Sequence, residues 1–274
     1  MMRILLTLCA GLAASTAFAD DGDLYAAEVV FLGEAHDNPG HHARQAALVA
    51  ELDPTALVFE MLSREQATQV RAEDRTDQAR LEALLGWEAS GWPDFAMYYP
   101  IFEAAPEAAI YGAALPRDEA REARDAPLAG VFGPSAGFYG LDEDLPPQMQ
   151  AMREDLQMAA HCNSLPPELL PMMVDIQRLR DARLAETALE AYAIHGGPVV
   201  VITGNGHART DWGAPMLARM AAPEVKVAAL GQGEDGAAPD GTFDLLEDSP
   251  SVARKDPCAD FVAPEPPAPA AAAD

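Results

Sequence analysis

Five short apolar runs, each stopped by turn-forming residues, constrain the fold of this 274-residue chain more than any other feature. They are rich in Val, Ile and Leu and lack the alternation of a half-exposed strand, which is typical of strands buried on both faces of a parallel sheet. The sequence therefore predicts a sheet that other elements cover on both sides. The runs are residues 29–32, 56–59, 109–111, 199–202 and 225–230.

Helical patterns lie between these runs. One covers residues 39–52, with Asn38 as its N-cap and Pro39 at its first helical position. Another begins near Pro147, and a long one extends over about 167–194. Strands that alternate with helices predict an α/β fold, with a mainly parallel central sheet flanked by helices.

The length suits one large domain, which we place at residues 20–262. Within it, the stretch from Ser63 to about Gln148 is longer and more helical than the other connections, so we expect a helical cap region over the sheet. Residues 263–274 are rich in Ala and Pro, which bury little surface and interrupt regular hydrogen bonding. We expect this segment to be a disordered tail.

The N-terminus has the pattern of a secretory signal peptide. Residues 1–19 contain a basic Arg3, an apolar stretch and a small-residue cleavage site that ends at Ala19. A lipoprotein is less well supported, because the bulky Leu8 precedes Cys9 where a small residue is expected. We therefore expect a periplasmic or secreted protein, cleaved near Ala19.

Cysteine content and net charge bear on the compartment of the protein and on the partners it can bind. Cleavage leaves Cys162 and Cys258, which we expect to form a disulfide in an oxidising compartment. The chain has 18 Lys and Arg against 44 Asp and Glu, a formal charge of −26. Because nonspecific binding to nucleic acid requires clustered positive charge, we expect no nucleic-acid partner.

Polar side chains follow three of the predicted strands at the point where each ends. The first run leads into Glu34 and His36, the second into Glu60, and the fourth into Asn205 and His207. In open α/β sheets, ligands bind beyond the carboxyl ends of the strands. The coincidence of these residues at three strand ends predicts a functional site there.

Two neighbouring groups admit more than one interpretation. His41 and His42 fall in the first turn of a predicted helix, where adjacent residues point about 100° apart, so we expect one of them to be a plain polar residue of that turn. Gln177, Arg180 and Asp181 share a face of the long helix. That face points either to the site or to solvent.

Four motifs occur in order over roughly residues 27–230. Together they resemble those of the ChaN family, the haem-binding uptake branch of the Tiki/ChaN/erythromycin-esterase-like superfamily. The first motif is Val-Phe-Leu-Gly-Glu-Ala-His-Asp-Asn-Pro at 30–39, followed by His41, His42 and Gln45, and the second is Val-Phe-Glu-Met at 58–61. The third consists of residues 161–166 with Gln177 and residues 180–182, and the fourth is Thr-Gly-Asn-Gly-His at 203–207 with residues 211–215.

The resemblance implies an exported protein of bacterial haem or iron acquisition, with haem in a pocket that two subunits share. Its implied partners are haem, a second copy of the chain and an outer-membrane haem receptor. Haem iron takes an axial His, Tyr, Cys or Met, and the aromatic segment 91–100 is either core or the wall of a pocket for a flat ligand. The candidate haem-binding residues are His36, His41, Tyr98, Tyr99, Gln177, Arg180, Asn205, His207 and Arg209.

The same strand ends admit a second function, a metal-dependent peptidase or esterase. Glu34, His36 and His207 would be its catalytic residues and, with Glu60, would ligate a divalent ion such as Mn, Co or Zn. Without a metal, His36 would serve as the base for ester hydrolysis. Close approach of Glu34 to His207 favours this hydrolase, whereas a broad apolar cleft between them favours haem. The sequence has no Gly-x-Ser-x-Gly motif, so a serine hydrolase is not expected.

Overall fold

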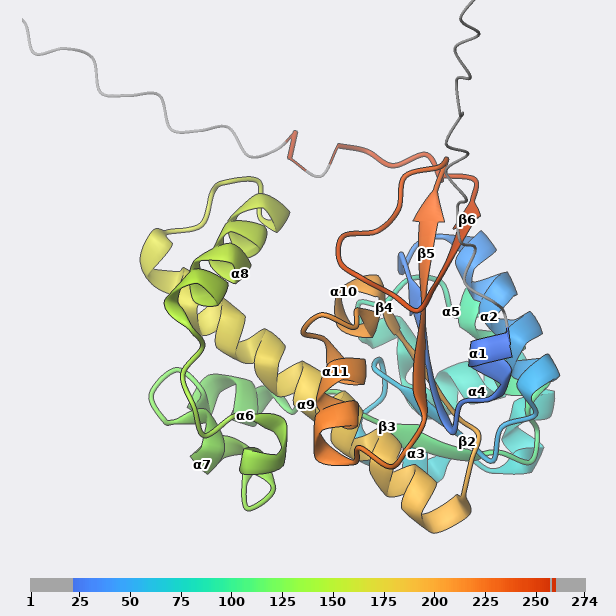
Figure 1. The fold of residues 1–274 in the computed structure, drawn as a ribbon. Coiled ribbons are helices and arrows are strands. Elements are labelled where there is room, and N and C mark those ends of the chain that lie inside the picture. Colours follow the sequence, from blue (N-terminus) through green and yellow to red (C-terminus); the bar gives the residue numbers. More distant parts are fainter. Residues whose placement is uncertain (1–21, 257, 260–274) are drawn as a thin grey trace, which may run out of the picture.

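The computed structural model describes residues 22–256 and 258–259, so the expected signal peptide at 1–19 and tail at 263–274 lie outside the described residues. It contains a six-stranded sheet in the order β3-β2-β4-β1-β5-β6, and every neighbouring pair is parallel (Figure 1). The predicted α/β fold with a parallel sheet is confirmed. The strands are β1 (Val29–Glu34), β2 (Ala56–Phe59), β3 (Ala109–Gly112), β4 (Val199–Gly204), β5 (Val227–Glu234) and β6 (Leu245–Ser249).

Each of the five predicted runs forms a strand, and β1 and β4 are buried along their whole length. The edge strand β6, beside β5, was not predicted. Its residues alternate between half-buried and exposed, and its sequence Leu-Leu-Glu-Asp-Ser is short and acidic. A half-exposed edge strand therefore lacks the continuous apolar run by which the others are recognised.

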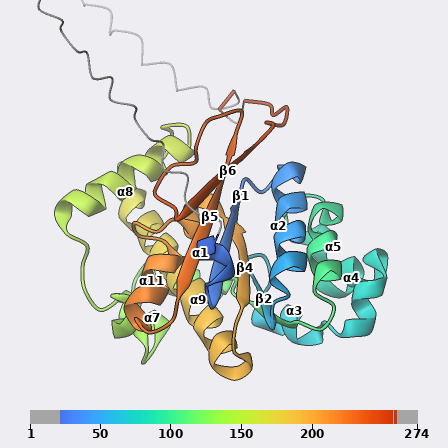
Figure 2. The ribbon, with the colours of Figure 1, turned by 45° about the vertical axis from the view of Figure 1, so that its right-hand side comes forward.

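The sheet separates two apolar cores, because successive strand residues face opposite sides. Figure 2 shows the helices that cover each face. One core contains Val30, Leu57 and Phe59 and packs against α2 (Pro39–Leu52), α4 (Gln78–Leu85) and α5 (Phe95–Ala104). The other contains Val29, Phe31 and Val58 and packs against α7 (Leu128–Phe132), α9 (Leu170–His195) and α11 (Ala214–Ala221).

The helical stretch expected at 63–148 contributes to both layers. Its first part, with α3 (Arg64–Gln69), α4 and α5, lies on the side of α2 (Figure 2). Its later part, with α6 (Arg117–Glu122) and α7, lies on the side of α9 (Figure 1). The elements that extend beyond the sheet are α8 (Pro147–Ala160) and the first half of α9, which pack together as a hairpin (Figure 1). None of the helices in the described ranges combines the length and apolarity needed to cross a membrane.

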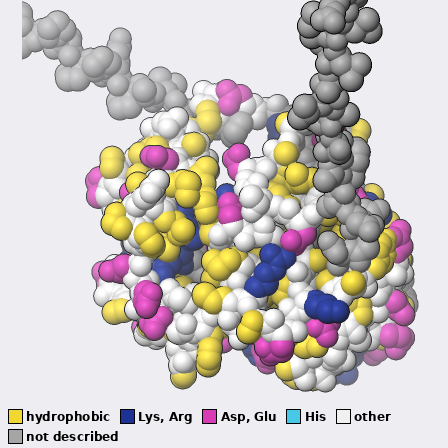
Figure 3. Space-filling view, in the orientation of Figure 1, with side chains coloured by type: hydrophobic (Ala, Val, Ile, Leu, Met, Phe, Trp, Pro, Cys, Tyr) yellow, Lys and Arg dark blue, Asp and Glu magenta, His cyan; other side chains and the backbone are white. Residues whose placement is uncertain are grey.

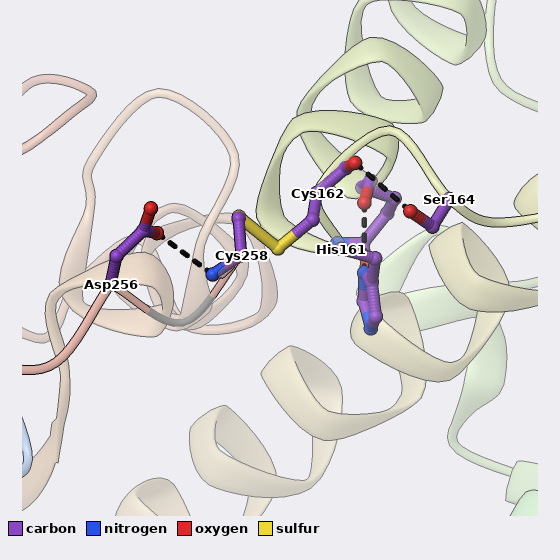
Figure 4. The surroundings of a disulfide bond; sticks show 6 residues. His161, Cys162, Ser164, Asp256 and Cys258 are labelled. Carbon is purple, nitrogen blue, oxygen red and sulfur yellow. Dashed lines mark hydrogen bonds between the residues drawn. A yellow bond between two sulfur atoms is a disulfide. The ribbon is translucent and has the colours of Figure 1, made fainter. Parts of the chain in front are cut away.

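A C-terminal arm, residues 250–256 with 258–259, links the two sides of the molecule. Arg254 forms bidentate contacts with Asp37, in the loop after β1, at 2.7 and 2.6 Å, and also contacts Glu234 at the end of β5. Near the other end, Cys258 is bonded to Cys162 in the connection between α8 and α9 (Figure 4). The expected disulfide is therefore formed, and it attaches the arm to the α8–α9 hairpin.

The disulfide spans 96 residues of sequence, so its removal enlarges the entropy of the unfolded chain. We expect the double variant C162S/C258S to lose about 2–4 kcal/mol of unfolding free energy in denaturant titrations. Dithiothreitol should cause a similar loss in the wild type and none in the double variant. Equal unfolding midpoints for the oxidised wild type and the double variant would show that the bond does not stabilise the fold.

Candidate functional site

The strand ends that carry the polar residues meet at a reversal of chain direction in the sheet. β1 and β4 are neighbours, but the chain leaves β1 through α2 toward β2 and leaves β4 through α11 toward β5, on the other side of β1. Ligands of open α/β sheets bind in the crevice at such a point. Here a cavity of about 520 Å³ lies between the strand ends and the α8–α9 hairpin. Its charged and aromatic lining residues are His36, Glu60, Trp92, Arg153, Arg180, Asp181, His207, Arg209, Trp212 and Asp240.

The loop after β1 presents His36 to the cavity, and Glu34 fixes the orientation of its ring. The Glu34 carboxylate is fully buried and accepts hydrogen bonds from His36 Nδ1 at 2.7 Å and from the Tyr98 hydroxyl at 2.8 Å. Because Nδ1 carries the proton in this hydrogen bond, the neutral ring has its lone pair on Nε2. The side chain of His36 is 34% exposed, and its ring meets Trp92 at a centroid distance of 4.9 Å.

A second imidazole, His207, lies in α10 (Asn205–Ala208), directly after β4. Its Nδ1 is 2.6 Å from the Asp181 carboxylate on α9, and its Nε2 is 3.6 Å from Glu60 Oε1. The other Glu60 oxygen accepts hydrogen bonds from Thr203 Oγ1 at 2.7 Å and from the Gly204 amide at 2.9 Å. Glu60, at the end of β2, is thus held by β4 and lies against His207.

Two carboxylates favour the charged form of His207. Burial alone would lower its pKa, but the charges of Glu60 and Asp181 outweigh burial and raise the pKa of His207 to about 9. The pKa of His36 is also raised, since the hydrogen bond that His36 donates to Glu34 and the charge of Glu60 outweigh its desolvation. Two imidazoles that are each oriented by a carboxylate can ligate a metal or transfer protons.

Glycines at two strand ends allow these groups to approach the backbone. A Cβ atom on Gly204 would lie 2.8 Å from His36 Nε2, so a side chain there would displace the His36 ring. A Cβ atom on Gly33 would lie 2.5 Å from Asn205 Oδ1. That oxygen accepts a hydrogen bond from the Gln232 amide, which ties the loop after β4 to β5.

Three residues predicted to bind haem lie outside the cavity lining. His41 is buried, accepts a hydrogen bond from the Ala35 amide at Nδ1, and reaches the Gly233 carbonyl through Nε2. Tyr98 lies beneath the site as a partner of Glu34, and Tyr99 donates a hydrogen bond to the Arg75 carbonyl. These residues support the loop and the core.

One of His41 and His42 was expected to be a plain polar residue of the first helical turn, but both have specific buried partners. Both side chains are fully buried, and His42 Nε2 bonds the His36 carbonyl at 2.8 Å. The two rings face the loop between β1 and α2, whose backbone groups need hydrogen-bond partners because they lie outside regular structure. Periodicity shows which positions face inward but not which backbone groups they will meet.

The remaining predicted haem-binding residues do line the cavity, namely His36, Gln177, Arg180, Asn205, His207 and Arg209. Asp181, on the same face of α9 as Gln177 and Arg180, also faces it. Trp92 belongs to the aromatic segment 91–100, for which a pocket wall was one of two interpretations, and it does line the cavity. Trp212, in the motif segment 211–215, was not predicted as a lining residue. Arg153 was not predicted either, because it is a single basic residue within α8 that no motif marks.

The alternative divalent-metal site is not supported. In the part of the chain that the structure describes, no group of three or more His, Cys, Asp or Glu side chains is arranged to hold a metal ion. Glu34, expected among the ligands, is buried behind His36 and does not line the cavity. Its carboxylate orients the imidazole instead.

The raised pKa of His207 predicts pH-dependent stability. With a pKa of about 9 when folded and about 6.5 when unfolded, the folded state retains a proton that the unfolded state releases between these values. The stabilisation is complete below pH 6.5 and is lost as the pH rises through 9, in total about 3 kcal/mol. We expect denaturant titrations to register this loss in the wild type and a much smaller one in H207N. The exposed His195 provides the control variant H195N, and equal pH dependence in H207N and the wild type would contradict the assignment.

Comparison with known proteins agrees with this architecture. The family model described as haem-binding uptake, Tiki superfamily, ChaN matches residues 22–217. A solved structure described as cofacial heme binding to ChaN of Campylobacter jejuni is 19% identical, has a TM-score of 0.63, and is matched over 82% of this chain and 88% of that one. At this identity the likeness establishes the fold alone.

Other solved structures are less similar, with TM-scores below 0.5, and we draw no conclusion from them. The type III effector HopBA1 is 14% identical with a TM-score of 0.43, over 84% of this chain and 91% of that one. A succinoglycan biosynthesis protein is 12% identical with a TM-score of 0.44, over 77% and 67%. No curated protein matches the sequence. Because the family model covers well over half of the chain, this protein belongs to the ChaN family of haem-binding uptake proteins in the Tiki superfamily.

Proposed function

We propose that this chain is an exported haem-binding protein that holds haem in the cavity at the strand ends. The observation that carries the proposal is the arrangement of Glu34 and His36. Glu34 holds the His36 ring through Nδ1, which leaves the Nε2 lone pair available at the cavity. A neutral imidazole of this kind, oriented by a carboxylate, is a common iron ligand in haem proteins.

The cavity has the size and walls that such a ligand requires. Pockets for small molecules and cofactors enclose about 300–1,000 Å³, and this one encloses about 520 Å³. Trp92 and Trp212 supply aromatic surface, and Leu156, Ala160 and Val174 supply apolar surface from the α8–α9 hairpin. Aromatic and aliphatic surface suits a flat, apolar macrocycle.

Different residues of the chain orient the iron ligand and cover the bound haem. Glu34 holds the ring of His36, and Tyr98 holds Glu34 from below. The α8–α9 hairpin covers the ligand and reduces its contact with water. Haem, when bound, supplies the iron that an uptake protein carries.

Export and partners are further parts of the proposal. The signal-like residues 1–19 and the disulfide support an oxidising compartment such as the periplasm. The Campylobacter jejuni ChaN is described as binding heme cofacially. We extend this arrangement to the present chain, with two copies sharing their haem groups and an outer-membrane haem receptor as the donor.

A hemin titration of residues 20–274 tests the site directly. We expect a saturable Soret change for the wild type and an affinity at least tenfold weaker for H36A, because an iron–imidazole bond is lost. The matched control is H195A, since His195 is exposed at the end of α9 and does not line the cavity. Binding to H36A with unchanged affinity and spectrum would reject His36 as the ligand. A featureless, unsaturable wild-type response would reject haem binding.

A further inference from the structure

Arg153, on α8, is a buried guanidinium with little to satisfy its charge. Only 9% of the residue is exposed, and it lines the cavity. Its Nε has no hydrogen-bond partner, and one terminal nitrogen reaches only the sulfur of Met149 at 3.5 Å. Its other contact is with the Trp212 ring, whose centroid is 5.0 Å from Cζ. Among the described residues, no carboxylate lies within ion-pair distance of Arg153.

Two nearby arginines are satisfied by the protein itself. Arg209 forms a bidentate pair with Asp211, with both N–O distances at 2.6 Å. Arg178 donates hydrogen bonds of 2.7 Å to the carbonyls of Gly140 and Glu143. Neither arginine has its whole guanidinium group free to bind a ligand. Of the two arginines among the candidate haem-binding residues, Arg180 and Arg209, Arg209 is therefore the less suitable partner for a ligand carboxylate.

Arg180 resembles Arg153 in this respect. It lies on α9, lines the same cavity and is exposed, and within residues 22–256 it forms no ion pair. Asp181 attracts Arg153 through its charge, but no acid of the cavity lies within ion-pair distance of Arg153 or Arg180 among the described residues. Asp181 is engaged by His207 and Glu60 by Thr203 and the Gly204 amide, while Asp240 is exposed.

An isolated buried charge is costly unless a partner compensates it. The guanidinium is a planar fork that matches the two oxygens of a carboxylate. It is unusual to find this group unpaired in a chain with a formal charge of −26, where carboxylates are abundant. In Figure 3, hydrophobic side chains gather on the surface over α8, and Lys or Arg side chains lie directly below them.

We propose that Arg153 is the anchor of an anion subsite in the cavity that binds a carboxylate of the ligand, with Arg180 adding positive charge from α9. This inference rests on the proposed function where the carboxylate is a propionate of haem. A carboxylate from another small molecule would have the same chemistry. The subsite fixes one end of the ligand at the α8–α9 hairpin, while His36 holds the other part at the strand ends.

Hemin and hemin dimethyl ester, in which both propionates are esterified, distinguish the source of the carboxylate. For the wild type we expect the ester to bind at least tenfold more weakly than hemin, the effect of losing one charge-assisted pair. R153M should weaken hemin by a similar factor and leave the affinity for the ester unchanged. R153K keeps the positive charge but loses the two-nitrogen guanidinium group. Its affinity for hemin should therefore lie between those of the wild type and R153M. The control is R117M, at an exposed arginine on α6 outside the cavity lining.

A second probe keeps the subsite testable if hemin does not bind. Sodium propionate is titrated while the indole N–H signal of Trp212, assigned with W212F, is followed by NMR. A saturable shift that R153M abolishes supports the subsite, and in the absence of hemin binding it assigns the carboxylate to another ligand. The inference is overturned if R153M changes neither the preference for hemin over its ester nor the propionate response. If the wild type does not bind hemin but still shows a propionate response that R153M abolishes, the proposed function fails while the subsite stands.

Discussion

The hydrogen bond between Glu34 and His36 is the interaction on which the candidate site depends. Glu34 ends the central strand β1, so its carboxylate is placed by the most buried part of the sheet. From there it accepts hydrogen bonds from His36 and Tyr98 and joins the loop after β1 to α5. A rigid strand thereby determines which nitrogen of the half-buried His36 ring faces the cavity. Binding groups held by rigid elements keep their geometry better than those of free loops.

The cavity is built from two parts that differ in kind. The strand ends supply imidazoles and carboxylates that are bonded to one another, with His207 between Asp181 and Glu60. The α8–α9 hairpin supplies apolar surface and arginines, and the disulfide ties its turn to the C-terminal arm. A flat ligand with an apolar body and charged edges needs both kinds of wall. The chain as a whole has a formal charge of −26, yet three arginines line this cavity.

Much of the fold could be predicted because strands that are buried on both faces have continuous apolar sequences. The continuous apolar runs identified β1 to β5, and Asn38 and Pro39 marked the start of α2, where the Asn38 side chain caps the Gly40 amide. The edge strand β6 could not be found this way, because it is half exposed. Glu60 and His207 could be predicted to meet, since the ends of parallel strands lie at one edge of the sheet. The burial of His41 and His42, and the position of Arg153, depend on which distant backbone and side chains pack against them.

Iron binding to His36 inside the cavity is the central claim about this protein, and the position of the iron tests it most directly. An anomalous difference map, measured at the iron absorption edge on crystals of the hemin-loaded protein, locates the metal without prior assumptions. We expect a single strong peak per bound haem, within bonding distance of His36 Nε2. A peak outside the cavity, or one bonded to another side chain while His36 remains on Glu34, would contradict it.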